Sequence, residues 1–252
     1  MADRPVGPGQ GAAGLSGLLG DTAAFVGDNA GLLLQRVGEH VQLSAVSLAI
    51  AMLVALPTAL ALGHTGRGGF LAINAANIGR ALPSLALIAI ALPFLGLNDR
   101  STIFALVLLG IPPILTNTYV AVREVDRDVI EAARGMGMNG GEILRAVELP
   151  LAAPVMMSGI RTAAVQIVAT ATLAAVIAGG GLGRFIVDGF ATRNNASVVT
   201  GAVAVALLTI LTELGLGAVE RAVTPRGSVR TDERAARGAR RAVPGGAKGG
   251  AQ

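Results

Sequence analysis

The sequence contains no cysteine and no tryptophan, and it has only two histidines among its 252 residues. Without cysteine, the chain can form no disulfide, no thiolate metal site and no cysteine nucleophile. His40 and His64 are too few to anchor a metal cluster, so we predict no metal site. The patterns His-Glu-x-x-His and Gly-x-Ser-x-Gly do not occur either. We therefore predict that the chain is not an enzyme.

Charge is also scarce and unevenly distributed. Charged residues make up 14% of the chain, against about 25% in soluble proteins. Hydrophobic residues make up 52%, and residues 41–62 and 162–183 contain no Asp, Glu, Lys or Arg. A run of about 20 apolar residues is long enough to cross a bilayer as a helix. The composition predicts an all-α membrane protein.

The apolar runs predict about five transmembrane helices. We expect them at residues 41–62, 69–95, 101–121, 155–178 and 198–219. The second run is interrupted by Arg80 and Pro83, so residues 69–81 are alternatively a separate helix that faces a water-filled cavity. A sixth span within residues 22–38 is possible but contains Asp28 and Arg36, and we prefer five.

The basic residues predict how the chain is oriented. Residues 221–252 form a Gly-, Ala- and Arg-rich tail with eight of the 20 Lys and Arg residues, which we expect to be disordered and cytoplasmic. With five spans, the segment 1–40 is then extracytoplasmic, and the transmembrane domain covers 41–220. The inner segments hold thirteen Lys or Arg and the outer ones five, which favours this orientation. A nucleic-acid arm is less favoured, because no aromatic residue interleaves with the arginines.

The loop 122–150 is the longest polar stretch between apolar runs. Its residues Val129, Ala132, Ala133 and Met136 follow the spacing of one apolar helix face, and Asp126 is a suitable N-cap. We expect Gly140-Gly141 to break the chain and a short second helix to run to about residue 147, before Pro150. The loop is either a docking element or an amphipathic helix lying on lipid headgroups.

The order of residues in this loop resembles the coupling loop, or EAA motif, of bacterial ATP-binding-cassette (ABC) importer permeases. The matching positions are Glu131, Ala132, Ala133, Gly137, Val147, Leu149 and Pro150, and we expect Gly135 to be a further small residue of the coupling site. The resemblance implies a type I importer permease (MetI-like) fold whose cytoplasmic loop docks on an ATPase. ATP and Mg²⁺ would be bound by that ATPase, and we expect no cofactor in this chain. Residues 179–183 are glycine-rich but lack the Gly-Lys-Ser/Thr of a phosphate-binding loop.

Residues 82–97, 116–120 and 176–183 are similar to the osmoprotectant branch of these permeases, which import glycine betaine, carnitine, choline, proline betaine and related amines. The resemblance implies a multi-pass protein of the bacterial plasma membrane, embedded in the lipid bilayer, with no nucleic-acid partner. Its partners would be two ATPase subunits, a second permease subunit (identical or a sister chain) and a separate extracytoplasmic substrate-binding protein. The alternative cargo is another small solute such as methionine. A secondary transporter is disfavoured, because five spans without an internal repeat cannot form two matching halves.

Polar residues inside the apolar runs are candidates for the transport pathway. Asn74, Asn77 and Ser84 form one stripe, and Asn117 and Tyr119 form a second. The equally favoured alternative is that they form hydrogen bonds between helices. With one tyrosine, six phenylalanines and no tryptophan, a tight aromatic cage for an ammonium group is not expected, and binding within the pathway should be weak.

Overall fold

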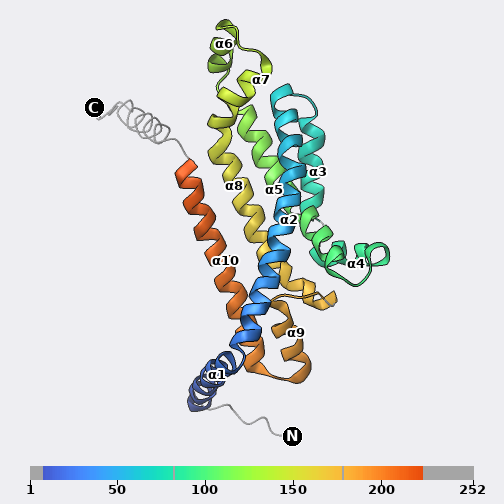
Figure 1. Cartoon of the computed structure of the whole chain (residues 1–252), viewed down its shortest axis with the longest axis vertical. Coiled ribbons are helices and arrows are strands. Elements are labelled where there is room, and N and C mark those ends of the chain that lie inside the picture. The colour runs from blue at the N-terminus through green and yellow to red at the C-terminus, as the bar shows by residue number, and fades with distance from the viewer. Residues whose placement is uncertain (1–7, 82, 178, 224–252) are drawn as a thin grey trace, which may run out of the picture.

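Apolar runs in a membrane must satisfy their backbone hydrogen bonds internally, and this chain does so with helices (Figure 1). The computed structural model describes residues 8–81, 83–177 and 179–223. The α-helices are α1 (Pro8–Asp28), α2 (Ala30–Thr65), α3 (Gly69–Ala81), α4 (Ser84–Leu95), α5 (Asp99–Arg123), α6 (Arg127–Gly135), α7 (Gly140–Ile143), α8 (Leu149–Thr170), α9 (Gly183–Thr192) and α10 (Asn195–Val223). A π-helical turn (Leu144–Glu148) precedes α8, and a 3₁₀ segment (Ala171–Ile177) follows it.

Among the residues that the structure describes, four helical stretches are long and apolar enough to cross a bilayer. They are Ala30–Thr65, Asp99–Arg123, Gly140–Leu173 and Asn195–Val223, and a shorter apolar helix covers Ala86–Leu95. The expected spans 41–62, 101–121 and 198–219 lie inside α2, α5 and α10. The expected span 155–178 is α-helical only to Thr170. The prediction of an all-α fold with about five membrane helices is confirmed.

The expected single helix over residues 69–95 is wrong, because the chain breaks at Pro83. Pro83 is the N-cap of α4 and has extended backbone angles (φ −62°, ψ 131°). Proline has no N–H to continue a helix, and it disfavours helical geometry in the residue before it. The alternative that placed a separate helix at 69–81 matches the observed α3.

The N-terminal part also differs from expectation. A sixth span does not form at 22–38, because this segment is divided between the end of α1 and the first turns of α2. Helix α1 was not predicted from the sequence. It packs against α10, and the rings of Phe25 and Phe185 meet edge to face at 6.1 Å. Residues 1–7 and 224–252, which include most of the basic tail, lie outside the described residues.

The core of the bundle lies where α2, α5 and α8 meet. Small residues on α2 and α8 allow the helix backbones to approach closely, and aliphatic side chains fill the space between them. The buried members are Ala51, Ala55, Ile114, Ile160 and Ala163. This packing fixes α2, α5 and α8 relative to one another.

Figure 1 shows α6 and α7 at one end of the bundle, hereafter the α6 end, and α1 and α9 at the opposite end, the α9 end. Helix α10 runs along the side of α8. Arg161 of α8 forms ion pairs with Glu213 (3.3 Å) and Glu220 (3.2 Å) of α10. Ionisable side chains are costly in lipid unless they are paired, so these contacts explain how charges are accommodated within two apolar helices.

Candidate functional site

Helix α6 begins where the sequence predicts. The Asp126 side chain accepts a hydrogen bond from the Asp128 backbone N–H at 2.9 Å, which satisfies a helix donor that has no intrahelical partner. The carboxylate of Asp128 lies in the first turn, where it complements the positive end of the helix dipole. The predicted N-cap is confirmed.

Helix α6 ends in a Schellman motif centred on Gly137. The Met138 N–H bonds to the Ala133 carbonyl (3.2 Å), and the Gly137 N–H bonds to the Arg134 carbonyl (2.9 Å). Gly137 has φ +86°, a conformation that costs other residues about 1 kcal/mol or more. No atom lies within 4 Å of the position where a Gly137 Cβ would be built. Glycine is therefore required at 137 by backbone conformation and not by close packing within the chain.

The predicted apolar face of α6 is mostly uncovered. Val129 is 42% exposed, Met136 is 76% exposed, and Ala132 and Glu131 are also exposed. Ala133 is buried within the chain itself, so its methyl group is not available for docking. The remaining small residue, Gly135, has open space at its Cβ position. Together these side chains form an exposed surface that is apolar, small and flanked by charge.

The second half of the loop differs from the prediction. Gly140-Gly141 does not break the chain but starts a helix, capped by reciprocal hydrogen bonds between Asn139 and Glu142 (2.7 and 3.1 Å). The helical path continues through the π turn into α8, with half-buried Leu149 and exposed Pro150 in its first turn. Proline at 150 has no N–H to bond the carbonyl four residues back, and its ring crowds that carbonyl. A locally wider π turn relieves this conflict, so no separate second helix forms.

A cavity of about 220 Å³ lies behind α6, against the ends of α2 and α5. Glu131, Arg127 and Arg134 of α6 line it together with His64 and Glu148. His64 Nδ1 lies 2.7 Å from Glu148 Oε2, and the Glu148 side chain is only 5% exposed. This contact joins the last turn of α2 to the start of α8, beside the loop.

The five candidate pathway residues lie on α3, α4 and α5. Helix α3 packs against α5, with Tyr119 occupying the space where a Cβ on Gly69 would lie. The Asn74 and Asn117 amides donate to carbonyls four residues back in their own helices, at 2.7 and 2.8 Å. Asn77 is exposed and Ser84 is half-buried. The amides of Asn74 and Asn117 satisfy backbone groups within a helix, and the pathway role of the five residues stays a prediction.

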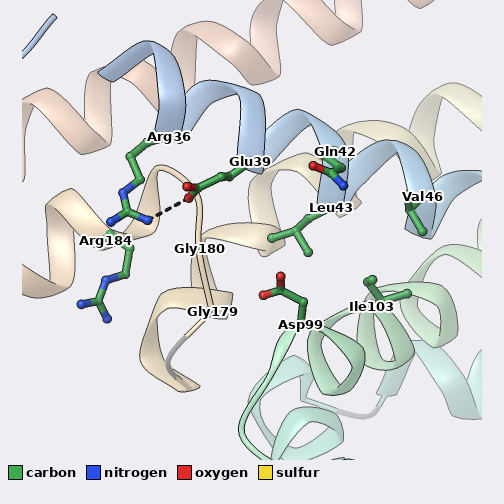
Figure 2. Close-up of a pocket in the computed structure, with 10 residues that line it drawn as sticks. All are labelled: Arg36, Glu39, Gln42, Leu43, Val46, Asp99, Ile103, Gly179, Gly180 and Arg184. Carbon is green, nitrogen blue, oxygen red and sulfur yellow. Dashed lines mark hydrogen bonds and ion pairs between the residues drawn. The ribbon is translucent and has the colours of Figure 1, made fainter. Parts of the chain in front are cut away.

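At the α9 end, two adjacent residues of α2 hold the turn that precedes α9. The Gly181 N–H donates to Glu39 Oε2 (2.9 Å), which also pairs with Arg36 (2.8 Å; Figure 2). The Leu182 N–H donates to His40 Nδ1 (3.3 Å), so the ring proton is on Nε2, which donates to the Val168 carbonyl (2.9 Å). His40 is completely buried. We call these contacts the α2 clasp.

Neither the clasp nor the His64–Glu148 contact was predicted from the sequence. Each joins residues separated by between 84 and 142 positions, and no local motif marks such pairs. The sequence feature that could have indicated these contacts is the position of His40 and His64 just outside the apolar run 41–62. Within the described residues, no group of three or more His, Asp or Glu side chains is arranged to hold a metal ion.

Residues 47–225 match the family of binding-protein-dependent transport system inner membrane components. The chain is 39% identical over 203 residues to the glycine betaine/carnitine/choline transport system permease OpuCB of Bacillus subtilis, covering 81% of this chain and 94% of that one. The Listeria monocytogenes carnitine permease OpuCB is 39% identical, covering 80% and 93%. The osmoprotectant import permease OsmY of Salmonella typhimurium is 37% identical, covering 77% and 83%. The chain is an ABC importer permease of the osmoprotectant family.

The fold of the permease is also that of a known importer. An inward-facing structure of the MetNI methionine ABC transporter matches 79% of the permease and 99% of its own chain, with a TM-score of 0.70 at 24% identity. As an inner membrane component, the permease is a multi-pass subunit that works with an ATPase and a binding protein and is not the catalytic subunit. The predictions of family and fold are confirmed.

The Schellman motif of the permease can be tested with two glycines of α6. Gly137→Ala should weaken the loop by about 1 kcal/mol, because the alanine must adopt positive φ. Gly135→Ala should leave the stability of the loop unchanged or raise it by up to about 1 kcal/mol, because position 135 is helical and unobstructed. Hydrogen exchange of the amides of residues 127–138 would measure both. Equal exchange in the two variants would contradict the conformational requirement at 137.

Proposed function

We propose that this permease imports osmoprotectant quaternary amines of the glycine betaine, carnitine, choline and proline betaine type, driven by ATP hydrolysis in a separate ATPase subunit. The cargo follows from the relatives, whose names specify glycine betaine, carnitine and choline transport. These relatives match the permease over about four fifths of its length. The likeness to the methionine transporter is a likeness of fold and does not favour methionine.

The structural observation that supports ATPase coupling is the uncovered surface of α6. The exposed apolar side chains of Val129 and Met136 would be removed from water if α6 docked in a groove of another protein. Exposed Glu131 could form a charged contact at the same interface. We propose that the loop 122–150 docks there through Glu131, Ala132 and Gly135. Gly137, Leu149 and Pro150 would act by setting the path of the loop. The His64–Glu148 contact lies where α2 would receive motion from this loop.

The assembly would contain two permease subunits, identical or paired with a sister chain, two ATPase subunits that bind ATP and Mg²⁺, and a separate substrate-binding protein. The α6 end would face the cytoplasm with the C-terminus, and the α9 end would face outward in a bacterial plasma membrane. This orientation agrees with the excess of basic residues in the inner segments. Closure of the ATPase pair would shift the packed helices between inward and outward access.

Uptake of radiolabelled glycine betaine tests this function. The permease would be expressed with its ATPase and binding protein in cells that lack their own betaine importers, with choline and methionine as competitors. We expect ATP-dependent uptake that choline reduces and methionine does not. An assembled complex that hydrolyses ATP but takes up no glycine betaine would contradict the proposed cargo, and labelled methionine would then be tested.

A further inference from the structure

A polar cavity of about 580 Å³ opens at the α9 end of the permease (Figure 2). It lies between residues 36–46 in the first half of α2, the start of α5 and the turn held by the α2 clasp. Its volume falls in the range of about 300–1,000 Å³ that small-molecule sites occupy. None of the residues predicted for the pathway lines this cavity.

The charges around the cavity are unevenly distributed, and the Glu39 carboxylate lies beside Arg36, with which it forms an ion pair (Figure 2). In Figure 2, Arg36 of α2 and Arg184 of α9 lie together on one side, and the Asp99 carboxylate of α5 lies away from them. Leu43 and Ile103 form an apolar wall near Asp99. A cavity with guanidinium groups at one side, and a carboxylate beside an apolar wall at the other, is complementary to a zwitterion with an alkylated ammonium group.

The existing contacts leave particular groups available to a ligand. The Glu39 carboxylate is already occupied by Arg36 and the Gly181 N–H. Arg184 pairs with Asp188 at 3.2 Å, but a guanidinium has five N–H donors, and this pair uses only part of them. Within the described part of the chain, Asp99 forms no ion pair and its carboxylate accepts no hydrogen bond. Asp99 lies in the first turn of α5, where its carboxylate is stabilised by the helix dipole. The dipole does not explain why this carboxylate also lines a cavity that contains Arg36 and Arg184.

We infer that this cavity is a transit site for zwitterionic quaternary amines, in which Asp99 faces the ammonium group and Arg184 binds the carboxylate. The inference rests on the proposed function and adds to it a location and two recognition residues in the permease itself. No aromatic ring is among the described residues that line the cavity, so the ammonium group gains no cation–π contact. Weak binding suits a step from which the solute must be released quickly.

The two charges predict different substrate profiles, because choline carries an ammonium group but no carboxylate. Asp99→Asn should lower uptake of both glycine betaine and choline by about tenfold, and Asp99→Glu should restore most of it. Arg184→Gln should lower glycine betaine uptake by about tenfold and change choline uptake by less than about twofold. Arg193→Gln is the matched control, because Arg193 is exposed at the end of α9 and does not line the cavity, and this variant should transport both solutes normally.

The test uses the complete importer in cells, with each solute labelled in turn and the amount of assembled complex measured for each variant. The site is supported if Arg184→Gln lowers the ratio of betaine uptake to choline uptake and Asp99→Asn lowers the uptake of both solutes. Normal uptake of both solutes by both variants overturns it and leaves the proposed function standing. Equal loss of both solutes in Arg184→Gln also overturns it, because a carboxylate contact cannot affect choline. If the unmodified importer takes up neither solute, the proposed function and the site fail together.

Discussion

Charge reversal at Glu131 is expected to lower ATP-driven uptake by about tenfold or more while leaving the permease in the membrane. Glu131 is exposed on α6, and within the described residues it has no ion-pair partner. It lines the cavity behind α6 together with Arg127 and Arg134, so a lysine would place a third positive charge on this helix. Loss of one charged contact at an interface costs about 1.4 kcal/mol or more, which corresponds to about tenfold.

The measurement is solute uptake and ATP hydrolysis by the assembled importer carrying Glu131→Lys. Glu131→Gln separates charge from hydrogen bonding, because it keeps an acceptor oxygen and should retain more uptake than the lysine variant. Glu124→Lys is the matched control, since Glu124 is exposed just before α6 and does not line the cavity. If Glu131→Lys and Glu124→Lys support equal uptake at equal assembly, Glu131 has no coupling role.

Local signals in the sequence predicted the elements that local physics determines. The apolar runs around 41–62 and 198–219 became α2 and α10, because a long apolar segment in a bilayer has few alternatives to a helix. Asp126 was recognisable as a helix cap, since the side chain and the N–H it accepts from are two residues apart. Pro83 marked the break between α3 and α4, although the sequence alone left open whether the helix would continue through it.

The features that were missed depend on contacts between distant parts of the chain. The π turn before Pro150 forms where the helical path joins the loop to α8, and the two glycines at 140 and 141 suggested a break instead. Helix α1 packs on α10, which is far from it in the sequence. The cavity at the α9 end brings together Arg36 of α2, Asp99 of α5 and Arg184 of α9. In the sequence, each of these residues looks like an ordinary surface charge. Polar residues within the apolar runs instead predicted a pathway along α3, the start of α4 and α5.

Replacement of His40 is expected to have the largest effect on stability. His40→Ala should lower the free energy of unfolding by about 2–5 kcal/mol, because it leaves a cavity and removes the partners of the Leu182 N–H and the Val168 carbonyl. The Val168 carbonyl lies in the last turn of α8, where carbonyls lack intrahelical donors, so His40 also caps that helix. Thermal unfolding of the purified importer in detergent would measure the loss.

Two conservative variants separate the two hydrogen bonds of His40. Asn can place an acceptor near the Leu182 N–H, and Gln can place a donor near the Val168 carbonyl, so each should lose less stability than alanine. Val41→Ala, next in the helix and 45% exposed, is the control and should cost less than about 1 kcal/mol. Gly181 has φ +88°, and its Cβ position lies 3.1 Å from His40 Nδ1, so a loosened clasp should also free this turn. Faster hydrogen exchange at residues 181 and 182 in His40→Ala, with unchanged exchange in α6, would locate the effect at the α9 end. A uniform increase in exchange throughout the permease would contradict a local clasp.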